Sequence, residues 1–186
     1  MIVWVVVMMV SLLPTDAGAQ HAHEHGVASL NVALDGKKLV VQLESPLDNL
    51  VGFEHAPRTD AQRAALAKME DTLRAGETWL KPAAAAGCTG RDVKVEQPYR
   101  TGAGGTAPEG DKRAAPAAKG KGKAEEEHAE VRAAYELECA TPAALDRVEV
   151  LLFDAFPKLK QIKAVTATPR GQGSATLTAR KRTLSF

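Results

Sequence analysis

Three histidines at every second position, in the run HAHEH, are the residues of this sequence best suited to chemistry. They are His21, His23 and His25, and the whole chain of 186 residues holds five histidines. In an extended segment, residues two apart lie on the same side of the backbone, so these imidazoles would converge. Neutral imidazole binds zinc, copper and nickel well. The spacing predicts a metal site; the alternative is a chance run at a mobile N-terminus.

Further ligands would have to come from other parts of the chain, because a zinc site takes about four nitrogen, sulfur or oxygen ligands in a tetrahedron. His55 and His128 are the other two histidines, and Glu24 and Glu54 are carboxylates beside histidines in the sequence. Alone, His55 could equally hydrogen-bond the backbone at a turn, and His128 could simply be solvated. We predict a ligand set made of all five histidines: His21, His23, His25, His55 and His128.

No pattern in the sequence indicates catalysis, and we expect a protein that is not an enzyme. Ser45 is the serine near a glutamate and a histidine, but it precedes a proline and lacks a nucleophile-elbow motif. A copper enzyme with an N-terminal histidine would require cleavage before His21, and Gln20 is a poor residue to precede a cleavage site.

The 24 basic and 23 acidic residues nearly cancel, which gives no electrostatic basis for binding nucleic acid.

The first 19 residues are predicted to be a signal peptide. Residues 2–13 form an almost unbroken apolar run that is too short for an ordinary transmembrane helix. The small residues Ala17, Gly18 and Ala19 follow and match a cleavage site before Gln20. The alternative is an uncleaved N-terminal anchor. After cleavage, residues 20–186 have a size that favours one domain. Their basic residues are not gathered on an amphipathic pattern, so we expect no membrane contact.

The two cysteines of the chain, Cys88 and Cys139, are predicted to form a disulfide. An exported protein enters an oxidising compartment, in which such a pair normally joins. The bridge would close a loop of about fifty residues and stabilise the fold by roughly 4 kcal/mol on a chain-entropy estimate. A thiolate metal site is disfavoured, because the cysteines lack the close CxxC-like spacing of such sites.

The elements that must position these residues read as strands with few helices. Residues 28–34 and 39–43 alternate between apolar and polar side chains around Asp35-Gly36, which predicts a β-hairpin. A helix should begin at Thr59 with Gln62 completing a capping box, present Leu66, Met69 and Leu73 on one face, and end at Gly76. Further extended runs occupy residues 131–139, 146–152, 162–168 and 175–179, with a single helical turn at 153–157.

The segment 101–127 has a different composition from its flanks. More than half of its residues are Ala, Gly or Pro, and it has no aliphatic side chain larger than alanine. Such a segment buries too little apolar surface to offset its ordering entropy, so we predict a disordered insertion. The sequence as a whole predicts one α+β domain of mainly antiparallel β-hairpins with a few helices, interrupted by this insertion.

Four motifs together resemble the ZrgA-like family of zinc-regulated periplasmic proteins. They are HEHG at 23–26, ESPLDNLVGFEHAP at 44–57, the strand at 128–139 and LFDAFP at 152–157, and the resemblance covers nearly all of residues 20–186. The matching histidines are His23, His25, His55 and His128, and His21 extends the first motif. In relatives the insertion is often rich in His and Asp, whereas residues 101–127 contain no histidine here. High-capacity zinc storage is therefore not expected.

The resemblance implies a periplasmic protein that binds zinc as cargo and contributes to zinc acquisition beside a zinc ABC importer or its binding protein. Occupancy should fall as the pH drops through the ordinary histidine range, about 6.5, because ligand imidazoles must be neutral. Two alternatives remain. A metal-independent interaction domain of the envelope would tolerate loss of all five histidines, and a copper-binding periplasmic protein would respond to copper rather than zinc limitation.

Overall fold

The structure is a computed structural model of the chain, and it describes residues 24–99 and 129–186. The predicted signal peptide at 1–19 and the predicted insertion at 101–127 lie outside the described residues. The same holds for three of the five predicted ligands, His21, His23 and His128. Within the described residues, no helix is both long enough and apolar enough to cross a membrane.

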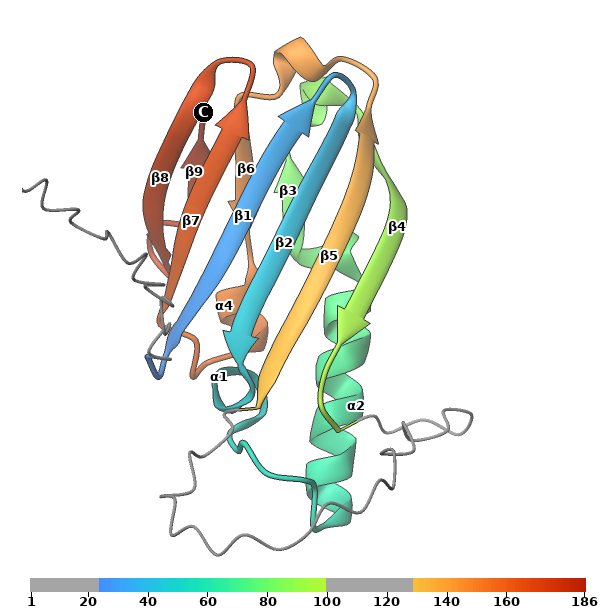
Figure 1. Cartoon of the computed structure of the whole chain (residues 1–186), viewed down its shortest axis with the longest axis vertical. Helices are drawn as coiled ribbons and strands as arrows, with labels where there is room; N and C mark the ends of the chain where they lie inside the picture. Colours follow the sequence, from blue (N-terminus) through green and yellow to red (C-terminus); the bar gives the residue numbers. More distant parts are fainter. Residues whose placement is uncertain (1–23, 100–128) are drawn as a thin grey trace, which may run out of the picture.

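A six-stranded sheet forms the main layer of the fold, with the strand order β4-β5-β2-β1-β7-β8 (Figure 1). The pairing of β1 with β7 is parallel, and the other neighbours in this sheet are antiparallel. The predicted α+β class with mainly antiparallel strands is confirmed. The strands are β1 (Val27–Asp35), β2 (Lys38–Pro46), β4 (Cys88–Glu96), β5 (Glu130–Cys139), β7 (Gln161–Thr168) and β8 (Gly171–Thr178).

A smaller sheet of three strands and the main helix lie against one face of the six-stranded sheet (Figure 1). The small sheet consists of β3 (Leu80–Pro82), β6 (Arg147–Val150) and β9 (Thr183–Ser185), in the order β3-β6-β9. The helices are α1 (Leu47–Val51), α2 (Asp60–Arg74), α3 (Gly76–Trp79) and α4 (Leu152–Ala155), and two 3₁₀ turns are η1 (Ala84–Ala86) and η2 (Pro142–Ala144). The predicted single turn at 153–157 corresponds to α4.

The first hairpin follows the alternation of its sequence. In β1 every second side chain, from Ala28 to Leu34, is buried, and the residues between them are exposed. This is the pattern of a strand with one face on the core. Asp35 pairs with Lys38 across the turn, and Gly36 adopts the left-handed φ of 55° that this tight connection requires. The predicted hairpin is confirmed.

Helix α2 begins as predicted but ends differently. The hydroxyl of Thr59 accepts a hydrogen bond from the backbone N–H of Gln62 at 3.2 Å, and the apolar face of the helix is buried. The predicted C-terminal cap at Gly76 is wrong, because α2 is capped by Ala75 and Gly76 begins α3. Glycine is needed at position 76 for packing: a Cβ there would lie 2.8 Å from the ring of Tyr135.

The predicted disulfide joins Cys88 and Cys139, which face each other across β4 and β5. Cys139 is fully buried at the end of β5. The bridge therefore closes the pair of strands that flank residues 100–128 in the sequence. Strand β5 begins at Glu130, close to the predicted start of its extended run.

Candidate metal centre

The described part of the predicted site begins with a tight turn that carries His25. The backbone N–H of Val27 donates to the carbonyl of Glu24 at 3.0 Å, and Gly26 adopts a left-handed φ of 81°. A glycine is favoured at this position because other residues rarely adopt a positive φ. The carbonyl of Gly26 accepts from the N–H groups of Lys160 and Gln161 at 2.8 and 2.9 Å. The turn is thereby fixed to the start of β7.

Asn49, on α1, ties this turn to the segment that follows β2. The residue is 1% exposed, its Oδ1 accepts from the N–H of Gly26 at 2.6 Å, and its Nδ2 donates to the carbonyl of Val27 at 2.9 Å. A third bond runs from Nδ2 to the hydroxyl of Ser45 at 3.3 Å. A buried amide that satisfies two backbone groups of another segment sets the position of that segment. Asn49 therefore determines where His25 lies relative to α1.

The result of this anchoring is that His25 lies beside the carboxylate of Asp48. The Nδ1 of His25 is 3.7 Å from Oδ2 of Asp48. Nitrogen and oxygen ligands bind zinc at about 2.0–2.2 Å, so two such atoms lie roughly 3.3 Å apart in a tetrahedral site. A movement of a few tenths of an ångström would let both atoms bind one ion. The His25 side chain is 71% exposed and that of Asp48 is 24% exposed, which leaves the pair open to solvent.

The second oxygen of Asp48 is held by Lys158, from the loop before β7. The Nζ of Lys158 lies 3.0 Å from Oδ1 of Asp48 and 3.4 Å from the carbonyl oxygen of Gly52. Gly52 ends α1 with a left-handed φ of 90°, and a Cβ at this position would lie 3.3 Å from Nζ. The carboxylate of Asp48 therefore contacts the imidazole of His25 through one oxygen and the ammonium group of Lys158 through the other.

His55 lies a few residues after α1, in the loop that leads to α2. It is exposed, its ring stacks on Phe53 with 5.3 Å between centroids, and its Nδ1 is 2.9 Å from the carbonyl oxygen of Ala56. The backbone contact that was the alternative role for His55 is therefore present. It is also the usual second contact of a metal-binding histidine: with the proton on Nδ1, the lone pair of Nε2 is left for a metal.

The segment 45–56, called here the α1 segment, contacts all three places where the described chain borders undescribed residues. The N–H of Leu47 donates to the carbonyl of Ala129 at 2.8 Å, and the hydroxyl of Tyr99 donates to the carbonyl of Glu54 at 3.0 Å. The third contact is that of Asn49 with Gly26. Figure 1 shows these chain borders around α1, at one end of the six-stranded sheet.

Of the predicted ligands the structure describes His25 and His55, and each has its own partners: His25 lies beside Asp48, and His55 contacts Phe53 and Ala56. Within residues 24–99 and 129–186, no group of three or more His, Cys, Asp or Glu side chains is arranged to hold a metal ion. Glu24, considered as a carboxylate ligand, pairs with Lys163, with 3.1 Å between Oε2 and Nζ. The carboxylate beside His25 is instead Asp48, which sequence reasoning missed. Its presence in the ESPLDN motif was the available signal, but a separation of 23 positions in the sequence hid the contact between His25 and Asp48.

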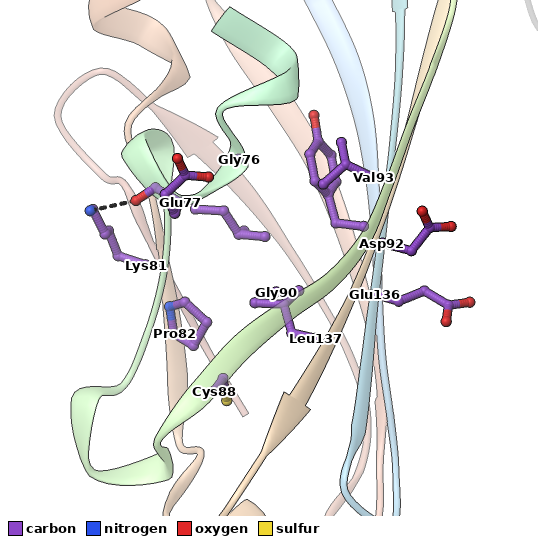
Figure 2. Close-up of a pocket in the computed structure, with 12 residues that line it drawn as sticks. Gly76, Glu77, Lys81, Pro82, Cys88, Gly90, Asp92, Val93, Glu136 and Leu137 are labelled. Atoms are coloured by element: carbon purple, nitrogen blue, oxygen red, sulfur yellow. Dashed lines mark hydrogen bonds between the residues drawn. The ribbon is translucent and has the colours of Figure 1, made fainter.

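A separate cavity of about 440 Å³ lies between β4 and the α3–β3 region (Figure 2). Its lining residues include Leu80, Asp92 and Tyr135 but no histidine. Lys81, at its rim, donates to the carbonyl of Glu77 at 2.6 Å. Burial raises the pKa of the Tyr135 phenol, so this hydroxyl stays neutral at ordinary pH. The cavity lining therefore lacks the imidazole ligands expected of the metal centre.

Comparison with known protein families finds a match over almost the whole chain. A family model described as "ZrgA family zinc uptake protein" matches residues 22–186. The matched range contains four of the five predicted ligands, namely His23, His25, His55 and His128. Comparison with curated proteins found no match to the chain.

Proposed function

The chain belongs to the ZrgA family of zinc uptake proteins, and from that premise we propose that it binds zinc as cargo and delivers it to a zinc ABC importer or to that importer's binding protein. The proposed site lies at the α1 end of the six-stranded sheet. Asp48 joins the histidines in it, and the histidine ligands are His21, His23, His25, His55 and His128.

The observation that carries this proposal is the approach of His25 to Asp48, with 3.7 Å between Nδ1 and Oδ2. The two residues come from different segments, and the buried side chain of Asn49 holds those segments together. Imidazole nitrogen and carboxylate oxygen are both common zinc ligands. A preformed pair reduces the ordering that the other ligands must provide when the ion binds.

The border contacts of the α1 segment support the inclusion of the remaining histidines. His128 directly precedes Ala129, whose carbonyl accepts from Leu47, and His23 directly precedes Glu24 in the turn beside Asp48. His55 belongs to the loop that leaves α1. These sequence neighbours are our reason to include the remaining histidines in the proposed ligand set.

The exposure of the pair suits a protein that gives up its metal. With 71% of the His25 side chain exposed, an ion bound there remains accessible to water and to a receiving protein. Structural zinc sites are closed by four protein ligands and have no open position. We expect exchange, and not catalysis, to be the role of this metal.

The periplasm is the proposed compartment. The disulfide between Cys88 and Cys139 supports it, because such bonds persist in oxidising compartments and are rare in the cytosol. The predicted signal peptide at 1–19 points the same way.

A zinc titration by calorimetry on residues 20–186 tests the proposal. We expect binding with a micromolar or lower Kd, lost when His21, His23 and His25 are changed together to Ala and weakened in Asp48→Asn. The matched control is Asp35→Asn, an exposed carboxylate at the far end of β1, which should bind as the parent does. Absence of zinc binding by the parent would refute the proposal and favour a metal-independent envelope domain. Growth under zinc and copper limitation then distinguishes the copper alternative.

A further inference from the structure

We infer that Lys158 is a built-in competitor of the zinc ion, whose ammonium group occupies the carboxylate of Asp48 in the metal-free protein and weakens zinc binding so that the cargo is released. This inference rests on the proposed function, and it concerns the regulation of affinity at the same site. Lys158 itself binds no metal in this scheme, because an ammonium group has no lone pair to donate.

The ammonium group of Lys158 is held by two oxygen atoms at the ends of α1. It lies 3.0 Å from Oδ1 of Asp48, at the start of α1, and 3.4 Å from the carbonyl oxygen of Gly52, the residue that caps the end of α1. A side chain at position 52 would crowd it, since a Cβ there would lie 3.3 Å from Nζ. The backbone of Gly52 is also in a conformation that other residues rarely adopt. The local fold therefore keeps this position open for the lysine.

Competition follows from the way the Asp48 carboxylate is divided. Oδ1 faces Lys158, whereas Oδ2 faces His25. An ion bound between Oδ2 and the imidazole would share one carboxylate with the ammonium group. Two cations beside one carboxylate repel each other. The ammonium group of Lys158 also neutralises part of the negative charge that would attract the metal ion. Zinc must then displace the lysine or bind a partly neutralised ligand.

The other lysines near this turn are engaged elsewhere. Lys160 donates to the carbonyl of Pro157 at 2.5 Å, and Lys163 pairs with Glu24 at 3.1 Å. Within the described chain, Lys158 is the lysine paired with Asp48. A change at position 158 therefore alters the counter-ion of the proposed ligand without touching the neighbouring pairs.

The test is calorimetric zinc titration of Lys158→Gln at low ionic strength, beside the parent protein. An exposed ion pair of this kind contributes up to about 1 kcal/mol, so we expect zinc affinity to rise roughly two- to fivefold. Lys158→Arg keeps the charge and should leave affinity within about twofold of the parent. The gain of Lys158→Gln should shrink at high salt, because exposed charges are then screened.

Lys38→Gln is the matched control. Lys38 pairs with Glu136 at 2.8 Å, its side chain is 55% exposed against 58% for Lys158, and it lies at the opposite end of the hairpin. Its removal changes the net charge by the same amount and should leave zinc affinity unchanged. A gain equal to that of Lys158→Gln would show a general charge effect and overturn the inference.

A double-mutant cycle with Asp48→Asn isolates the mechanism. If Lys158 acts through the carboxylate, Lys158→Gln should have no effect on zinc affinity in the Asp48→Asn background. A persisting gain, or no gain in the parent background, overturns the inference while the zinc-binding function stands. Failure of the parent to bind zinc overturns both proposals, so the two failures are distinguishable.

Discussion

Replacement of Asn49 by alanine should separate the turn that carries His25 from α1. The amide of Asn49 accepts from the N–H of Gly26 and donates to the carbonyl of Val27 and the hydroxyl of Ser45. The residue is 1% exposed. Alanine leaves these groups without their partner, and water must enter or the turn must move. We therefore expect Asn49→Ala to lower both the stability of the fold and the affinity for zinc.

The size of the stability loss follows from the contacts. Each hydrogen bond contributes about 0.5–1.5 kcal/mol net, and a buried group left unsatisfied costs roughly 1–3 kcal/mol. The N–H of Gly26 and the carbonyl of Val27 are only partly buried, so water recovers some of the loss. We expect a decrease in the free energy of unfolding of about 2–4 kcal/mol. For a domain of this size that corresponds to a Tm lower by roughly 5–15 °C.

Urea denaturation followed by circular dichroism measures this loss, and zinc titration of the folded variant measures the second effect. Asn31→Ala is the matched control, because Asn31 lies on the exposed face of β1 and should change stability by less than about 0.5 kcal/mol. Equal stability of Asn49→Ala and Asn31→Ala would refute the anchoring role of Asn49. A destabilised variant with unchanged zinc affinity would refute the link between that anchor and the metal site.

Two further predictions concern the core that supports the site. Changing Cys88 and Cys139 together to Ser should lower the free energy of unfolding by about 4 kcal/mol on the chain-entropy estimate, because the bridge joins residues 51 positions apart. Urea denaturation without reductant measures this loss, and a midpoint equal to that of the parent would contradict the prediction. Tyr135→Phe removes the bond from the phenol to the carbonyl of Leu73 at 2.8 Å and should cost roughly 1–2 kcal/mol near neutral pH. Because burial raises the pKa of this phenol, the unfolded chain ionises first, and stability falls above about pH 10 in the parent protein. A thermal melt series should show a smaller alkaline loss in the variant, and parallel curves would contradict this assignment.

The parts of the fold that sequence reasoning predicted are those with strong local signals. The β1–β2 hairpin has a regular alternation and a glycine at the turn, and α2 has a cap and an apolar face. Strand β4 was missed because it is an edge strand: its side chains are largely exposed, and a bulge between Gly90 and Asp92 interrupts its register. Strands β3 and β9 are three residues long and too short to show a period.

The errors and omissions at particular residues have a common physical cause, which is contact between segments distant in the sequence. Gly76 follows a helix in the sequence and was predicted to cap it. The structure shows another reason for a glycine here: the ring of Tyr135, on β5, occupies the space that a side chain would need. Asp48 and His25 come together through the pairing of β1 with β2 and through Asn49. Nothing in the local pattern of either segment contains this information.

The ESPLDNLVG stretch belongs to one of the four motifs that resemble the family, and contacts of three of its residues or of their neighbours explain its composition. Asp48 presents one oxygen to His25 and the other to Lys158. Asn49 is buried and fixes the turn before β1, and Gly52 leaves room for the lysine. These three residues all shape the surroundings of the proposed zinc site, although each has a different role. A change at Asn49 should therefore weaken zinc binding by moving the imidazole, whereas a change at Lys158 should strengthen it by freeing the carboxylate. Zinc affinity should thus fall in the Asn49 variant and rise in the Lys158 variant, and the Lys158 variant should keep its fold. A surface that binds no metal would show neither change.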